Sequence, residues 1–122
     1  MKVTRSADCG NSPKNHLVED VCVAMASLDV VAVRDLLSEN VHWRRVGKDD
    51  VEGLEEVIEA VQRGKRPRSV LIDQVVTHGR GGAANGEVVS AAGRKVAFCH
   101  VFRFANARGS AVQRIVSYVV KA

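Results

Sequence analysis

One predicted strand gathers most of the aromatic residues of this chain, and it constrains the fold more than any other feature. Residues 94–120 predict a hairpin whose first strand carries, at alternate positions, Phe98, His100, Phe102 and Phe104. Because successive side chains of a strand point to opposite faces, these four share one face of a sheet. Three of the five aromatic residues (three Phe, one Trp, one Tyr) therefore surround one histidine. We interpret this face as the wall of a pocket.

The second half of the chain has a period of two throughout. Four strands are predicted, over 69–78, 83–91, 95–105 and 111–120, with turn residues such as glycine and asparagine between them. Because the connections are short, neighbouring strands should be antiparallel and form a meander. A strongly twisted sheet of this kind can curl around helices and bury one face.

The first half has a helical period. Ser12 and Pro13 form a start signal, because serine caps free backbone amides and proline at the first helical position loses no hydrogen bond. A helix is predicted over 13–27, and Asp29 should cap a second, shorter one that reaches Leu37 and meets the first at a sharp corner. A short strand over 41–46 and a third helix over 53–62 follow. The fold class is therefore α+β.

The length of 122 residues indicates one domain, which we assign to residues 12–122. Residues 1–11 have no apolar run, so we expect a disordered segment and neither a signal peptide nor an anchor. No later apolar run approaches the ~20 residues that span a bilayer. We therefore expect no membrane association and a cytoplasmic location.

The three cysteines, Cys9, Cys22 and Cys99, are an odd number without metal-site spacing. Reduced thiols in a cytosolic protein fit this pattern better than disulfides, and no histidine is tied to any of them. The histidines share no metal-ligand spacing either. The sequence predicts no metal and no cofactor.

The last two predicted strands are apolar on both faces. If the phenylalanines face inward, then Ala97, Cys99 and Val101 face outward. An exposed apolar patch of this size needs a cover, and a second copy of the chain would provide one. We therefore predict a homodimer packed through the sheet; the alternative is that the alternation only reflects strand propensity.

A net charge of +4 allows an acidic partner but is modest for a protein that binds nucleic acid. The basic residues concentrate in the loop 63–68, which contains no aromatic residue. Base stacking needs such residues, so a solvated loop is favoured over a nucleic-acid site.

The order of elements resembles the NTF2-like superfamily, with its α+β (cystatin-like) cone of three N-terminal helices in a strongly curved antiparallel sheet. The chain is most similar to its SnoaL-like and ketosteroid-isomerase-like branch. The resemblance rests on segments at matching positions: Leu28-Asp29-Val30, Asn40-Val41-His42-Trp43, Val51-Glu52-Gly53, Phe102-Arg103-Phe104 and Ser117-Tyr118-Val119-Val120. It implies a conical cavity between sheet and helices. Because members include isomerases, cyclases, hydrolases and non-catalytic modules, the chemistry stays open.

Ketosteroid isomerases use a carboxylate base on the first strand, with a tyrosine and a protonated aspartate that stabilise the oxyanion. Matched on Gly47, Asp29 and Phe102-Arg103-Phe104, these three positions fall on Arg45, Val21 and His100, respectively. None is retained, so the resemblance does not extend to that mechanism. Limonene-epoxide-hydrolase-like chemistry would need a carboxylate–arginine–carboxylate relay, for which Arg45 with Asp73 or Glu87 are the available residues.

The candidate site joins five residues. We expect His100 to act as proton shuttle or oxyanion donor and Arg45 as anion clamp, with Trp43, Phe98 and Phe102 as apolar walls. The structural alternatives are a buried neutral histidine, a core tryptophan and an arginine at the solvated rim. The predicted function is binding of a small apolar ligand with one polar or anionic group, with acid–base chemistry of the isomerase, hydrolase or lyase type as an extension. The alternative is a homodimeric assembly module whose cavity is filled by side chains.

Overall fold

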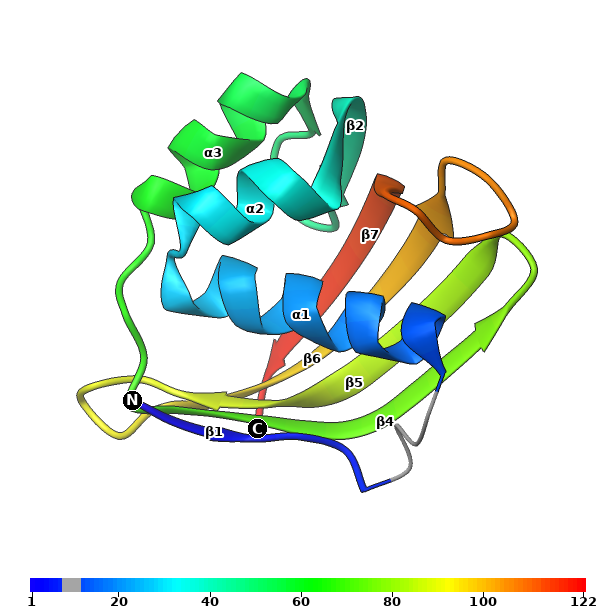
Figure 1. The fold of residues 1–122 in the computed structure, drawn as a ribbon. Helices are drawn as coiled ribbons and strands as arrows, with labels where there is room; N and C mark the ends of the chain where they lie inside the picture. The colour runs from blue at the N-terminus through cyan, green and yellow to red at the C-terminus, as the bar shows by residue number, and fades with distance from the viewer. Residues whose placement is uncertain (8–11) are drawn as a thin grey trace.

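The computed structural model describes residues 1–7 and 12–122. The helices are α1 (Pro13–Ser27), α2 (Val30–Leu36) and α3 (Leu54–Gln62). The strands are β1 (Lys2–Thr4), β2 (Leu37–Arg45), β3 (Val51–Glu52), β4 (Ser69–His78), β5 (Gly81–Val89), β6 (Lys95–Phe104) and β7 (Val112–Lys121). The strands form one sheet in the order β1-β4-β5-β6-β7-β2-β3, which curls around α1 (Figure 1). The predicted α+β fold with a strongly curved sheet is confirmed.

Both predicted helix starts are present. The hydroxyl of Ser12 accepts a hydrogen bond from the Asn15 amide at 3.2 Å, and the carboxylate of Asp29 accepts one from the Ala32 amide at 3.2 Å. Between these helices, Leu28 has a φ of 61°, a left-handed conformation that costs a non-glycine residue free energy. Its amide caps the carbonyls of Ala24 and Met25. This residue makes the sharp corner that the sequence predicts.

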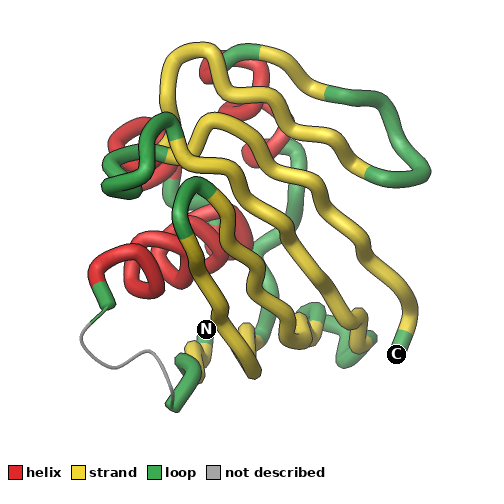
Figure 2. Tube along the Cα trace, turned by 90° about the vertical axis from the view of Figure 1, so that its right-hand side faces the viewer, coloured by secondary structure: helices red, strands yellow, loops and turns green. Residues whose placement is uncertain are grey.

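The meander β4-β5-β6-β7 is antiparallel throughout, as predicted. Two further pairings are parallel: β2 joins β7, and β1 joins β4. Figure 2 shows the sheet in front of the helices, so the helices cover only one of its faces. We call the helix-covered face the inner face and the opposite one the outer face.

Two predicted segments differ from the structure. Lys2–Thr4 form β1 and pair with Ser69–Leu71, whereas the sequence predicts disorder over residues 1–11. A strand of three exposed residues has no local apolar pattern, and only the edge of β4 gives it partners. Leu37, predicted as helical, begins β2 instead. Cys9 lies outside the described residues.

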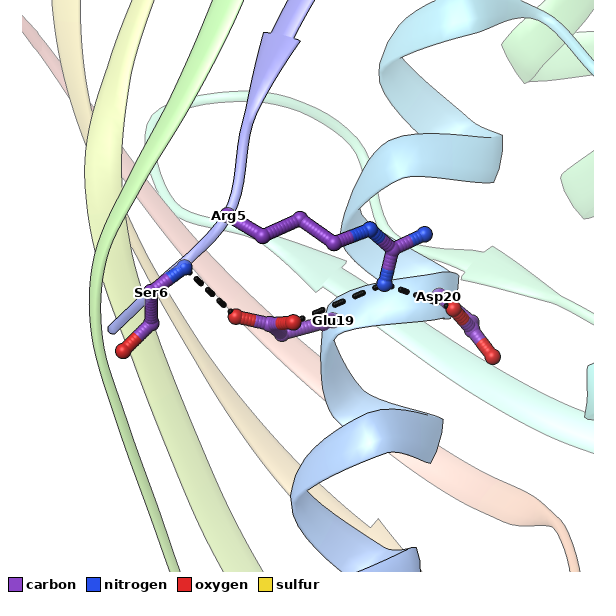
Figure 3. A network of polar contacts seen from close by, with 4 residues as sticks. All are labelled: Arg5, Ser6, Glu19 and Asp20. Carbon is purple, nitrogen blue, oxygen red and sulfur yellow. Dashed lines mark hydrogen bonds and ion pairs between the residues drawn. The ribbon is translucent and has the colours of Figure 1, made fainter. Parts of the chain in front are cut away.

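The N-terminal strand is fastened to α1 through Glu19, whose side chain is fully buried (Figure 3). One carboxylate oxygen accepts a hydrogen bond from the Ser6 amide at 2.8 Å, and the other lies 3.5 Å from Arg5 Nη1. Arg5 also pairs with Asp20 at 2.8 Å. Because a buried carboxylate needs hydrogen-bonding partners, these contacts hold β1 in place.

The core lies between α1, α3 and the inner face. Its largest fully buried side chains include Phe104 and Ile115, from neighbouring strands of the meander. Among the described residues, no helix has the length and apolar character needed to cross a membrane.

Candidate functional site

A cavity of about 460 Å³ lies beside this core, between α1 and the inner face. Residues of α1, β2, the end of α3, the loop that follows it and the meander strands line it. A volume of this size is in the range of small-molecule sites, roughly 300–1,000 Å³. Trp43 and His100 are both among the residues that line the cavity.

Four of the five predicted site residues line this cavity: His100, Arg45, Trp43 and Phe98. Phe102 does not. Its side chain is 2% exposed and belongs to the core, with its ring edge-on to His100 at a centroid distance of 6.1 Å. The inner face of β6 thus lines a cavity at one end and a packed core at the other.

Phe98 reaches its position because β5 has glycine opposite it. Gly86 pairs with Phe98, and a Cβ at that glycine would meet the Phe98 ring at 2.9 Å and the Leu71 carbonyl oxygen at 1.9 Å. The Phe98 ring also stacks on His100, with centroids 4.8 Å apart and an interplanar angle of 25°. The absence of a side chain at Gly86 therefore allows this stack to form over the sheet.

A short hydrogen-bonded chain holds His100 from its other side. Trp43 Nε1 donates to Ser117 Oγ at 2.8 Å, and His100 Nδ1 lies 2.7 Å from the same oxygen. These three residues come from β2, β7 and β6. Burial lowers the pKa of His100 from 6.5 to about 4, so the imidazole is neutral at physiological pH. The two interpretations of His100 are therefore compatible: its ring is buried and neutral, and it also lines the cavity.

The lining carries three cationic side chains, Arg45, Lys48 and Lys65. Arg45 lies over the Trp43 ring at 5.3 Å, and its Nε donates to the Asp49 carbonyl at 3.1 Å. Lys48 and Lys65 also line the cavity, and no aspartate or glutamate among the described residues does. Within the described part of the chain, none of these three cations forms an ion pair with a carboxylate.

The two carboxylates considered for a hydrolase relay lie elsewhere. Asp73 is exposed on β4, and Glu87 forms an ion pair with Lys95 at 3.5 Å. Neither lines the cavity. A carboxylate–arginine–carboxylate relay around Arg45 is therefore not assembled from them.

Ser117, Lys48 and Lys65 are polar lining residues that the sequence does not assign to the site. The sequence does contain a signal for Ser117, because it follows Ile115 by two residues and so lies on the same buried face of β7. A polar residue at such a position must find a partner. The two lysines lie in loops, and a loop has no helical or strand period from which the direction of a side chain can be predicted.

One cysteine lines the cavity. Burial, and secondarily the nearby Glu19, raise the pKa of the Cys22 thiol to about 12. The thiol is therefore un-ionised at neutral pH and is a packing residue. Over the described residues, no group of three side chains is placed to hold a metal ion.

The outer face has a groove of about 410 Å³, floored by small residues that include Ala83, Ala97 and Cys99. Large, exposed apolar side chains also line it. Val76 is 65% exposed, Tyr118 48% and Val120 64%. This is the apolar patch that the sequence predicts on this face.

The sequence matches a family model described as SnoaL-like domain over residues 18–112. No curated protein matches the chain. The NTF2-like fold itself is confirmed by solved structures.

An NTF-2 like protein of unknown function from Burkholderia xenovorans LB400 superposes with a TM-score of 0.77 at 13% identity, over 89% of this chain and 84% of that one. An LEH-like epoxide hydrolase from M. tuberculosis gives 0.71 at 15% identity, over 88% and 82%. An NTF2-like protein of unknown function from Cytophaga hutchinsonii ATCC 33406 gives 0.66 at 20% identity, over 88% and 99%. At these identities the likeness extends to the fold alone.

Proposed function

Since the chain belongs to the SnoaL-like domain family, we propose that it binds a small, mainly apolar molecule with one anionic group in the cavity between α1 and the sheet. The composition of the lining carries this proposal. The walls are apolar, while Arg45, Lys48 and Lys65 supply positive charge, and no carboxylate of the described part of the chain lines the cavity. Cations beside an apolar surface favour a ligand that brings both an apolar body and a negative charge.

Acid–base chemistry on that ligand is the reaction class that we propose for the site. His100 is the one imidazole among the described lining residues, and Arg45, which lies over the Trp43 ring, would hold the anion. Among the described residues no carboxylate lines the cavity, so a carboxylate base of the ketosteroid-isomerase kind is not part of the proposal. An isomerase, hydrolase or lyase reaction would therefore depend on hydrogen bonding to a developing negative charge.

A thermal-shift screen tests the binding proposal. The panel holds apolar acids, terpenoids, polyketide-like aromatics and steroids. A ligand at ~100 times its Kd adds about 2.7 kcal/mol of stability, which raises Tm by several degrees. We expect hits among the apolar acids, weakened in both Arg45→Ala and His100→Ala.

Arg103→Ala is the matched control, because Arg103 is an exposed arginine on β6 that does not line the cavity. It should bind as the wild type does. A ligand that shifts Tm equally in the wild type, Arg45→Ala and His100→Ala would remove these residues from the site.

We further propose that two copies associate through the outer face. The exposed side chains of Val76, Tyr118 and Val120, beside a groove of small residues, support this contact. Association would bury them without closing the cavity, which opens on the inner face. In the alternative function, an assembly module, this contact would be the activity, and no ligand on the panel would bind.

A cytoplasmic location is part of the proposal, because free thiols at Cys22 and Cys99 fit a reducing compartment. Nucleic acid is not among the proposed partners. The loop 63–68 offers charge but no aromatic residue for stacking on bases.

A further inference from the structure

The hydroxyl of Ser117 connects two ring nitrogens and has a single proton to share. Its side chain is buried, in a residue that is 4% exposed. The indole nitrogen of Trp43 is a donor only, so at 2.8 Å it must donate to Ser117 Oγ. That bond occupies one lone pair of the oxygen and leaves its proton for another acceptor.

His100 Nδ1 provides that acceptor, at 2.7 Å from Ser117 Oγ. A serine proton directed there satisfies all three groups in the order Trp43, Ser117, His100. If Nδ1 carried the proton instead, Ser117 Oγ would accept twice and its own proton would have no partner among the described contacts. We infer that Ser117 is a positioning residue, which holds His100 in the tautomer that carries its proton on Nε2 and presents that N–H to the cavity.

The Nε2 edge of the ring is open to the cavity. No protein group among the described residues bonds to Nε2, and no buried side-chain nitrogen or oxygen lacks a partner, so Nε2 is accessible. Stacking on Phe98 and the edge contact with Phe102 fix the plane of the ring. The N–H direction is therefore set by the protein before a ligand arrives.

The consequence, which rests on the proposed function, concerns the ligand's head group. His100 Nε2–H, Arg45, Lys48 and Lys65 are all hydrogen-bond donors that line the cavity. Such a set matches a group with acceptors only, such as a carboxylate or an enolate oxygen. It favours an acid over the alcohol of the same shape, because the hydroxyl brings a donor and no charge. His100 then donates a hydrogen bond and does not act as the general base.

Nitrogen-15 NMR of the histidine rings in the unliganded protein tests the tautomer, since protonated and unprotonated ring nitrogens resonate far apart. The His100→Gln variant identifies the signal of this residue among the four histidines. At pH 7 we expect a neutral ring with the proton on Nε2. Ser117→Ala should shift the population toward the Nδ1–H form, and Ser117→Thr, which keeps a hydroxyl, should restore the Nε2–H form.

A wild-type ring protonated on Nδ1 would overturn the inference, and so would an unchanged tautomer in Ser117→Ala. The backbone amide spectrum of each variant shows whether it is folded. If Ser117→Ala does not fold, Trp43→Phe keeps the test available: without the indole donor Ser117 Oγ can also accept from Nδ1–H, so the Nδ1–H form should become more populated, and an unchanged tautomer would overturn the inference.

Binding of octanoate and of 1-octanol separates this inference from the proposed function. In the wild type octanoate should bind more tightly, and Ser117→Ala should reduce that preference by roughly tenfold, the effect of one hydrogen bond to a charged group. If neither probe binds while the Nε2–H tautomer is observed, the proposed function fails for this ligand class and the role of Ser117 stands. An unchanged preference in Ser117→Ala would overturn the link between tautomer and head group.

Discussion

The inner and outer faces of β6 and β7 are similarly apolar, yet they differ in how far their side chains are buried. On the inner face Phe104 and Ile115 are fully buried under the chain's own helices. On the outer face Val101, Tyr118 and Val120 are between 43% and 64% exposed. The alternation of side chains along these strands therefore identifies two apolar surfaces. The path of the rest of the chain decides which of the two becomes the core.

The inner face is itself divided along β6. Phe102 and Phe104 pack tightly, while Phe98 and His100 line a cavity. Both halves belong to one row of alternate residues, so the row by itself does not decide where the cavity lies. Substitutions in the packed half should therefore affect stability alone, whereas substitutions in the cavity half should also affect binding.

The largest expected effect comes from the packed half. Phe104→Ala should lower the free energy of unfolding by about 3–5 kcal/mol, because it removes a fully buried ring and leaves a cavity. Urea denaturation followed by circular dichroism measures it. A loss below about 1 kcal/mol would mean that this end of the sheet repacks freely.

The cavity half should show a pH dependence. The pKa of His100 is about 4 in the folded chain against 6.5 as its ordinary value, so the unfolded chain binds the extra proton between these values. The neutral ring therefore makes its whole contribution to the free energy of unfolding above pH 6.5. This contribution, about 3 kcal/mol at most, is lost as the pH falls toward 4.

Unfolding of the wild type and His100→Gln across this range isolates the contribution of that residue. As the pH falls from 6.5 toward 4, the unfolding free energy of the wild type should decrease more than that of His100→Gln. A constant difference would show that the ring of His100 titrates alike in both states.

A substitution on the outer face should change the association of two copies of the chain. Val120→Lys puts a charge into the proposed contact and should weaken dimerisation roughly tenfold or more, as measured by sedimentation. Val31→Lys is the matched control, because Val31 is 71% exposed on α2, away from the sheet. Equal effects of the two substitutions, or a wild type that stays monomeric, would argue against the contact.

The smallest effect is expected for Val101→Ala, measured at concentrations at which the chain is monomeric. Val101 is 43% exposed, and substitutions at such sites usually change stability by about 0.5 kcal/mol or less. A loss comparable to that of Phe104→Ala would erase the distinction between the two faces.

Much of the fold could be predicted from sequence because it follows from local signals. The caps at Ser12 and Asp29, the helical stripes and the four strands of the meander each depend on residues near one another in the chain. By contrast, β1 has no pattern of its own, and the buried Glu19 is an ordinary surface residue in any local interpretation. Their contacts join segments 13 or more residues apart, as the Ser6–Glu19 bond does.

The candidate site divides in the same way. The sequence by itself determined that Phe98, His100 and Phe102 share one face, since the period of a strand is two. Only the tertiary structure decided that Phe102 belongs to the core, and that Lys48 and Lys65 lie at the cavity where His100 meets Ser117. Periodicity assigns a side chain to a face, but neighbours across that face come from strands and loops distant in the chain. Which of them meet depends on the curvature of the sheet and on the path of the helices over it.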